Sequence, residues 1–180
     1  MKKLLIMGIV AFQAQAFAST PAQVAGTIED FENVAVQPPA LSLDLPGMTI
    51  DSYYNGNVDA QRPMLAVESD SASSMKGHHL VVRTEYQPIS NWHDGGFWLR
   101  PKVAANGIRF RMEVNQQKAQ RMTLSCDSNQ AGGDFEFVNV WLPDHGEVSA
   151  YCPASMHLSF IQFFTVGEGL AFRFDDIELR

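Results

Sequence analysis

Basic residues are scarce in this sequence, which has 13 Lys and Arg against 20 Asp and Glu among its 180 residues. Proteins that bind phosphate backbones or anionic membranes do so through clusters of Lys and Arg. No cluster longer than a pair occurs here, so the composition argues against nucleic acid and anionic membranes as partners. The excess of carboxylates is instead suited to a metal ion that neutralises some of them.

A hydrophobic run of the ~20 residues needed to span a bilayer is also missing. The apolar stretch from Leu4 to about Phe12 is much shorter, follows Lys2 and Lys3, and precedes Ala16-Phe17-Ala18. This order of a basic start, a short apolar run and a small-x-small pattern is typical of a signal peptide. We therefore expect cleavage after Ala18, export to the periplasm or the extracellular space, and no membrane anchor.

Cysteine is rare, because only Cys126 and Cys152 occur, both after the expected cleavage site. In an oxidising compartment a single pair is most simply a disulfide. Closing a loop of about 27 residues would stabilise the fold by roughly 3.5 kcal/mol in the chain-entropy estimate. A catalytic thiol would need a free cysteine beside a histidine base, which the exported context disfavours. We predict a Cys126–Cys152 disulfide.

Recognisable catalytic signatures are absent as well. The sequence contains no Gly-x-Ser-x-Gly, no His-Glu-x-x-His, no Gly-x-Gly-x-x-Gly and no P-loop, which removes the familiar hydrolase, zinc-protease and nucleotide-binding classes. An enzyme stays open as an alternative. His93-Asp94 could supply an acid/base pair, and Glu113 and Glu136 could serve a glycosidase, whose chemistry depends on the separation of two carboxylates.

The residues that are present follow the pattern of β-strands almost throughout. The run IRFRMEV at 108–114 alternates apolar and charged side chains, as a strand does when one face is buried. Turn signals such as Asn55-Gly56 and Asp94-Gly95-Gly96 separate the candidate strands. The pattern predicts an all-β, single-domain β-sandwich of the jelly-roll type with about nine strands. We expect them at 28–32, 40–45, 64–67, 79–84, 96–100, 108–114, 135–142, 158–164 and 170–179.

Three parts of the chain follow from these patterns. Residues 1–18 are expected to be the signal peptide, residues 19–26 a flexible leader, and residues 27–180 one β-sandwich binding domain.

The two ends of the expected domain look complementary. The run IEDFE stands at 28–32 and LAFRFDDIEL at 170–179. In the closing run Phe172 and Phe174 share one parity and Ile177 the other, so a strand of period two must slip by one register. A bulge at Asp175-Asp176 would produce the slip and project carboxylates beside those of the first strand. Such a cluster would suit a hard cation such as calcium.

These motifs carry a family resemblance. The opening DFE, the GHHLVV strand at 77–82 and the closing FRFDDIEL resemble the galactose-binding-like β-sandwiches, especially the xylan- and glucan-binding carbohydrate-binding modules. The resemblance implies a secreted, non-catalytic module that binds a polysaccharide or another glycan. It also implies a structural calcium ion that joins the first and last strands. The implied ligands are the carboxylates of Glu32 and Asp175 and the carbonyl oxygens of Asp30 and Lys76.

One position departs from the related pattern. Related chains often carry an acidic residue three places before the Lys, where this chain has Ser73. One calcium ligand would then be missing, replaced by water, or drawn from Asp70.

Sugar binding needs flat aromatic faces for the C–H surface of a pyranose and fixed amides or carboxylates for its hydroxyls. The runs at 135–142 and 158–164 are apolar on both faces, so the face turned away from the partner sheet must be covered by loops or line a concave groove. The modules that the chain resembles bind glycans there. Ordinary core packing is the alternative for each aromatic side chain. The candidate ligand-binding residues are Trp92, Trp98, Asn91, Asp94, Tyr54 and Trp141.

Two other functions stay open beside the glycan-binding module. One is a small glycan-active enzyme, a lyase or a glycosidase, on the same jelly-roll fold. The other is a matrix or adhesion domain that binds another protein, because a fold of this kind does not by itself determine a function.

Overall fold

The computed structural model describes residues 27–54, 62–69, 74–84, 95–116, 120–128, 133–165 and 169–180. These residues form thirteen β-strands, and none of them forms a helix that could cross a membrane. The all-β class is therefore confirmed. In chain order the strands are β1 (Thr27–Glu29), β2 (Gln37–Ala40), β3 (Ser42–Asp44), β4 (Met48–Tyr54), β5 (Met64–Ser69), β6 (His78–Thr84), β7 (Gly95–Pro101), β8 (Gly107–Val114), β9 (Gln120–Asp127), β10 (Phe135–Leu142), β11 (His145–Tyr151), β12 (His157–Thr165) and β13 (Leu170–Leu179).

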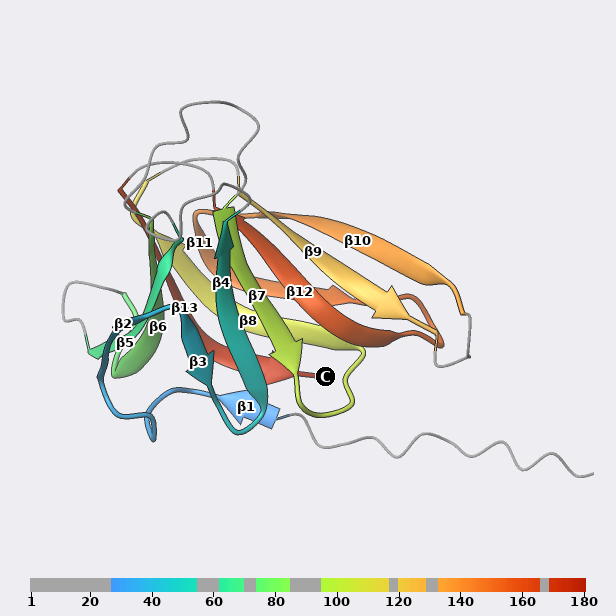
Figure 1. Ribbon diagram of the computed structural model, residues 1–180, viewed down its shortest axis with the longest axis horizontal. Helices are drawn as coiled ribbons and strands as arrows, with labels where there is room; N and C mark the ends of the chain where they lie inside the picture. Colours follow the sequence, from blue (N-terminus) through green and yellow to red (C-terminus); the bar gives the residue numbers. More distant parts are fainter. Residues whose placement is uncertain are drawn as a thin grey trace, which may run out of the picture.

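The strands make two antiparallel sheets. One has seven strands in the order β11-β8-β13-β6-β5-β2, with β1 also paired to β13, and the other has six in the order β10-β9-β12-β7-β4-β3. Figure 1 shows β9 and β10 on one side of the molecule and β2, β5 and β6 on the other. The predicted sandwich is confirmed.

A cluster of aromatic side chains packs between the two sheets. Phe97 and Phe163 of the six-stranded sheet stack with their ring centroids 4.3 Å apart. Phe174 of the seven-stranded sheet meets Phe163 edge to face at 5.4 Å, and Phe110 meets Phe163 at 5.7 Å. These are the offset and edge-to-face geometries that aromatic pairs prefer. Because all four rings are buried, they determine which side chains of their strands face the core between the sheets.

The sheets contain more strands than the sequence predicts, because β2, β4, β9 and β11 do not stand out as strands. The inward positions of β9 include Gln120 and Cys126 beside Met122 and Leu124, so its apolar alternation is interrupted. Strand β11 buries only Val148 and Ala150. A strand recognised by large apolar residues at every second position is missed when its inward residues are polar or small.

The two ends of the described chain pair with each other as expected. Thr27 lies opposite Leu179 and Glu29 opposite Ile177. The register of β13 shifts between Asp175 and Glu178, and Asp176 has a φ of 50°, so the predicted bulge is confirmed. Strand β6 pairs with β13 before the bulge and β1 pairs with it after the bulge, which buries both Phe174 and Ile177.

The predicted disulfide is also confirmed. It joins Cys126 of β9 in the six-stranded sheet to Cys152, which directly follows β11 of the seven-stranded sheet. The bond is therefore a covalent link between the two layers of the sandwich. The expected signal peptide and leader, residues 1–26, lie outside the described residues.

Candidate functional site

The candidate site is the outer face of the six-stranded sheet, the side turned away from the seven-stranded sheet. Residues directly opposite one another in antiparallel strands project to the same side. The register places one row across five strands, from β10 to β4: Trp141, Arg121, Phe164, Gly96 and Tyr53. The next residues along three of these strands, Met122, Phe163 and Phe97, are buried in the core. The row therefore points outward.

Two further rows lie beside the first. The second row consists of Asn139, Thr123, Gln162, Trp98 and Asp51. The third row includes Phe137, Ser125 and Phe160. The outer face thus carries aromatic side chains on β10, β12, β7 and β4, with polar side chains among them.

Strand β10 exposes a line of large apolar side chains. Phe135, Phe137 and Trp141 are 63%, 60% and 70% exposed, and Asn139 between them is exposed too. Strand β10 is the edge of its sheet and pairs only with β9, so these side chains have neighbours on one side. Exposed apolar patches of this kind mark interaction sites more often than chance.

A second aromatic cluster surrounds Trp98. Its ring centroid lies 5.3 Å from that of Tyr53 and 6.0 Å from that of Phe160, and the Arg100 guanidinium lies 4.7 Å above it. The indole N–H is buried and has no hydrogen-bond partner among the described residues. Buried donors normally have an acceptor, so this N–H is a group that a ligand or a further part of the chain can satisfy.

Hydrogen bonds fix the polar side chains of the outer face. Gln162 donates through Nε2 to the Tyr53 hydroxyl at 2.6 Å, and Thr123 donates its hydroxyl proton to Oδ1 of Asn139 at 2.7 Å. The second bond orients the Asn139 amide and leaves its NH2 group for another acceptor. Asp51 accepts from Ser42 at 2.6 Å and pairs with Arg100.

Gly96 lets β7 lie close to the backbone of β12 and to the Tyr53 side chain. A Cβ at this position would lie 1.9 Å from the Phe163 carbonyl oxygen and 3.0 Å from the Tyr53 hydroxyl oxygen. Any side chain here would push against backbone that cannot move freely, so the close approach of β12 requires glycine.

The structure places the predicted sugar-binding residues unequally. Trp98 and Trp141 both lie on the outer face, in neighbouring rows. Tyr54 is described only as the last residue of β4, with its backbone paired to Gly95. Asn91, Trp92 and Asp94 lie outside the described residues.

Sequence reasoning missed several residues of the outer face. Phe160, Phe164 and Gln162 belong to the run at 158–164 that is apolar on both faces. That pattern could have identified them, because it indicates that one side of this strand faces away from the core. Arg121 and Thr123 lie on β9, which the sequence does not reveal as a strand, so nothing pointed to them.

The predicted calcium ligands come together only in part. The Glu32 carboxylate packs against the turn at Gly77, where φ is +79°, and its Oε1 accepts a hydrogen bond from the His78 backbone N–H at 3.2 Å. A Cβ at Gly77 would lie 1.6 Å from this Oε1. Glu32 is therefore held beside the Lys76-Gly77 turn. Asp70 and Ser73 lie outside the described residues.

Asp175 has a different partner. It is 4% exposed and accepts hydrogen bonds from Arg111 at 2.8 Å and from the Asp176 backbone N–H at 2.9 Å. Burial raises the pKa of Asp175, and these hydrogen bonds only partly oppose the rise. A cation at this position would therefore compete with the Arg111 guanidinium.

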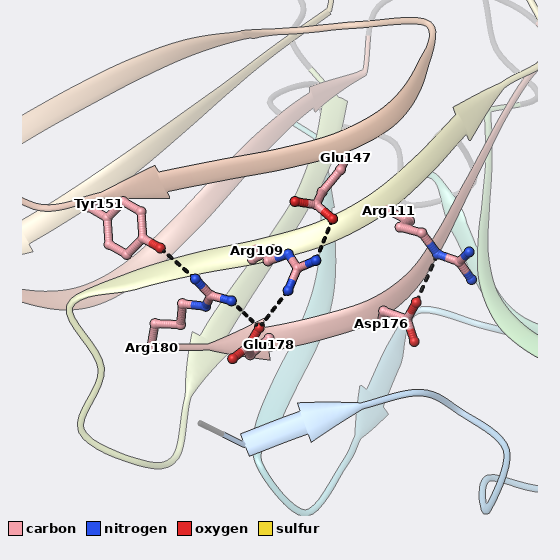
Figure 2. A network of polar contacts seen from close by, with 7 residues as sticks. All are labelled: Arg109, Arg111, Glu147, Tyr151, Asp176, Glu178 and Arg180. Carbon is pink, nitrogen blue, oxygen red and sulfur yellow. Dashed lines mark hydrogen bonds and ion pairs between the residues drawn. The ribbon is translucent and has the colours of Figure 1, made fainter. Parts of the chain in front are cut away.

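Arginines neutralise the neighbouring carboxylates in the same way (Figure 2). Arg109 bonds Glu147 at 2.5 Å, and Arg180 bonds Glu178 at 2.7 Å and the Tyr151 hydroxyl at 2.9 Å. These arginines lower the pKa values of Glu147 and Glu178. No group of three or more His, Cys, Asp or Glu that could hold a metal occurs in the described part of the chain.

The carboxylates considered for catalysis lie in different sheets. Glu113 on β8 of the seven-stranded sheet accepts hydrogen bonds from the Ser74 hydroxyl at 2.5 Å and the Ser74 backbone N–H at 3.1 Å. Glu136 is exposed on β10 of the six-stranded sheet. His93 lies outside the described residues, as does Asp94.

No family model matches the chain, and no curated protein matches it in sequence. Solved structures do resemble it. The CBM22-1 xylan-binding domain of Xyn10C from Paenibacillus barcinonensis is 10% identical, with a TM-score of 0.43, over 72% of this chain and 84% of that chain. A mutant of the family 29 module CBM29-2 complexed with mannohexaose is 13% identical, with a TM-score of 0.44, over 87% and 92%.

A third similar structure is the family 11 carbohydrate-binding module from Clostridium thermocellum in complex with a β-1,3-1,4-mixed-linked tetrasaccharide. It is 12% identical, with a TM-score of 0.43, over 78% of this chain and 95% of that chain. Carbohydrate-binding modules of three families are thus among the solved structures to which this chain is similar.

Proposed function

We propose that the protein is an exported, non-catalytic module whose outer face binds a polysaccharide. The observation that carries the proposal is the outer face itself, where exposed aromatic side chains on β10 stand beside amides fixed by hydrogen bonds.

The side chains match the two surfaces of a sugar ring. A pyranose has an apolar C–H face, which stacks on a flat aromatic ring, and hydroxyls around its edge. Trp141 offers an exposed indole, and Asn139, one row away on the same strand, offers a free NH2 group. A ring stacked on Trp141 therefore has a hydrogen-bond donor at its edge.

The length of the row favours a polymer over a single sugar. Trp141 and Tyr53 are four strands apart, and neighbouring strands are about 4.8 Å apart, so the row extends for roughly 19 Å. A ligand that contacts both ends of the row must cross several strands. An extended chain of sugars meets this requirement.

Replacing Trp141 by alanine tests the proposal. The indole is 70% exposed, so Trp141→Ala should leave the melting temperature unchanged while weakening polysaccharide binding by roughly 1–3 kcal/mol, the range for one aromatic anchor. Affinity electrophoresis in gels that contain soluble xylan, mannan or mixed-linked glucan measures the loss. Tyr151→Ala is the control, since Tyr151 is an exposed aromatic residue of the other sheet.

Three results would redirect the proposal. If Trp141→Ala migrates like the wild type in a gel that retards the wild type, the outer face at β10 is not the binding surface. Release of reducing ends from any of the polymers would make the protein a glycan-active enzyme. Failure of the wild type to bind a broad panel of glycans would favour the protein-binding domain instead.

We also propose, from the resemblance, that a calcium ion stabilises the junction of the first and last strands. Support comes from the Glu32 carboxylate beside the turn at Gly77. The Arg111–Asp175 pair limits what Asp175 can contribute, so Glu32 and the carbonyl oxygens of Asp30 and Lys76 would be the main protein ligands, completed by water.

A further inference from the structure

We propose that the polysaccharide is a mostly neutral chain that carries occasional uronic acid residues, and that Arg121 binds their carboxylates. The inference rests on the proposed function and names the substrate class of the same outer face.

Arg121 lies on the outer face between two aromatic side chains. It lies opposite Trp141 of β10 on one side and Phe164 of β12 on the other. Its guanidinium lies 4.3 Å from the centroid of the Phe164 ring. Stacking on an aromatic ring holds the plane of the guanidinium and leaves the N–H groups at its edge available to an anion.

Arg121 makes no ion pair with any described residue, and this distinguishes it from six other arginines of the described part of the chain. Arg100, on the same face, also stacks on an aromatic ring but is paired with Asp51. Six arginines form ion pairs with acidic side chains: Arg83, Arg100, Arg109, Arg111, Arg173 and Arg180. A half-buried cation without a counterion, on an apolar surface, is a receptor for a carboxylate.

The surroundings of Arg121 are uncharged. Its neighbours on the outer face are Trp141, Phe164, Thr123 and their row partners Asn139 and Gln162. Asp127 faces the same side of β9 six residues away, which is about 20 Å along a strand. A carboxylate bound at Arg121 therefore meets no acidic side chain nearby.

A uronic acid residue can contact the Trp141 ring and the Arg121 guanidinium at the same time. Its ring has a C–H face for Trp141, and its carboxylate extends from the ring edge, where a planar fork of N–H donors can bind both oxygens. A neutral sugar would leave the guanidinium without a counterion.

The charge of the remaining face argues for sparse substitution. Asp127, on the same side of β9 as Arg121, makes no ion pair with described residues, and the whole chain has 20 Asp and Glu against 13 Lys and Arg, a formal net charge of −7. A polymer with a carboxylate on every sugar would set several of its charges against these acids, whereas an occasional carboxylate needs only Arg121.

Glucuronoxylan and its carboxyl-reduced form test the inference, because they differ only in the charged group. The mature wild type should bind the native polymer about 10- to 100-fold more tightly than the reduced one, the factor expected for a hydrogen bond to a charged partner. Arg121→Gln should bind both forms at the level of the reduced polymer. Arg109→Gln, which loses the same charge on the opposite sheet, should keep the difference.

Other arms separate this inference from the proposed function. If the wild type binds native and reduced polymer equally, and Arg121→Gln changes neither, the inference is overturned while polysaccharide binding stands. Preference for a sulfated or fully uronic polymer also overturns it. Binding of no polymer at all removes the proposed function as well. Should Arg121→Gln fail to fold, Arg121→Lys, which keeps the charge but loses the planar fork, should show a reduced preference.

Discussion

Gly77 is the residue at which backbone conformation and a neighbouring side chain constrain each other. Its φ of +79° is the left-handed region, and a Cβ there would overlap Glu32. Gly77→Ala should lower the free energy of unfolding by more than the about 1–2 kcal/mol that a left-handed conformation costs a residue with a Cβ, because the added Cβ also displaces the Glu32 carboxylate. Chemical denaturation with urea measures this loss.

A second variant separates the two causes at Gly77. In a Glu32→Ala background the clash is gone, so Gly77→Ala should cost only the conformational part. If the single and double comparisons give the same difference, the Glu32 carboxylate swings away freely and is not held by the turn.

Single residues also show what the sequence could and could not reveal. Trp98 and Trp141 could be predicted as candidates from the sequence alone. Trp98 follows a glycine pair, and Trp141 lies on a strand that is apolar on both faces. Arg121 could not be predicted in this way, because its role depends on what lies opposite it on β10 and β12. The stacked cation without a counterion depends on how the side chains of three paired strands, β9, β10 and β12, meet on one face.

At the scale of elements, the segment before β6 is fastened to β8 by one carboxylate. The two hydrogen bonds from Ser74 lower the pKa of Glu113, and burial only partly opposes them. Because the folded pKa lies below the unfolded one, the stabilisation is present above pH 4.5 and is lost as the pH falls through the folded pKa.

Glu113→Gln should therefore lower the free energy of unfolding by about 1 kcal/mol at pH 7, the usual net worth of such hydrogen bonds. The difference from the wild type should shrink at acidic pH, once the pH has fallen through the lowered pKa of Glu113 and its side chain is neutral. Ser74→Ala serves as the partner control. A difference that is the same at both pH values would show that the charge of Glu113 contributes nothing.

The disulfide acts between elements of different sheets, since it joins β9 to the residue after β11. With a sequence separation of 26, reduction should lower the free energy of unfolding by about 3.5 kcal/mol in the chain-entropy estimate. Melting of the oxidised protein and of the same protein in dithiothreitol gives the comparison without any mutation. Equal melting temperatures, with both thiols shown to be free, would contradict it.

For the whole molecule, the calcium proposal concerns how the ends of the chain are held. A cation bound only by the native state adds about 2.7 kcal/mol at a hundredfold excess over its dissociation constant. Chelation should lower the melting temperature of the wild type, and Glu32→Gln should abolish the response. Asp175→Ala is a poorer choice, because it also removes one of the two acidic partners of Arg111. Glu147→Gln, away from the turn at Gly77, is the control.

The outcome that contradicts the calcium proposal is a melting curve that does not change on chelation, in protein from which bound metal has been shown to be removed.

The overall architecture was predictable, whereas its strand count was not. Regular turn signals and alternating strands such as 108–114 are sufficient to predict an all-β sandwich, and the register slip in LAFRFDDIEL is sufficient to predict the position of the bulge. Four strands were missed because burial by the partner sheet does not require large apolar residues at every inward position. Gln120 and Ala150 are buried in strands that a periodicity search passes over.

The pairing of β1 with the end of β13 determines where a fused partner would be attached to the domain. Thr27 lies opposite Leu179, so the two ends of the domain emerge side by side, from the sheet opposite the outer face (Figure 1). A cargo fused at either end would therefore be attached to the seven-stranded sheet. If the outer face binds polysaccharide as proposed, such a cargo would not occupy the binding surface.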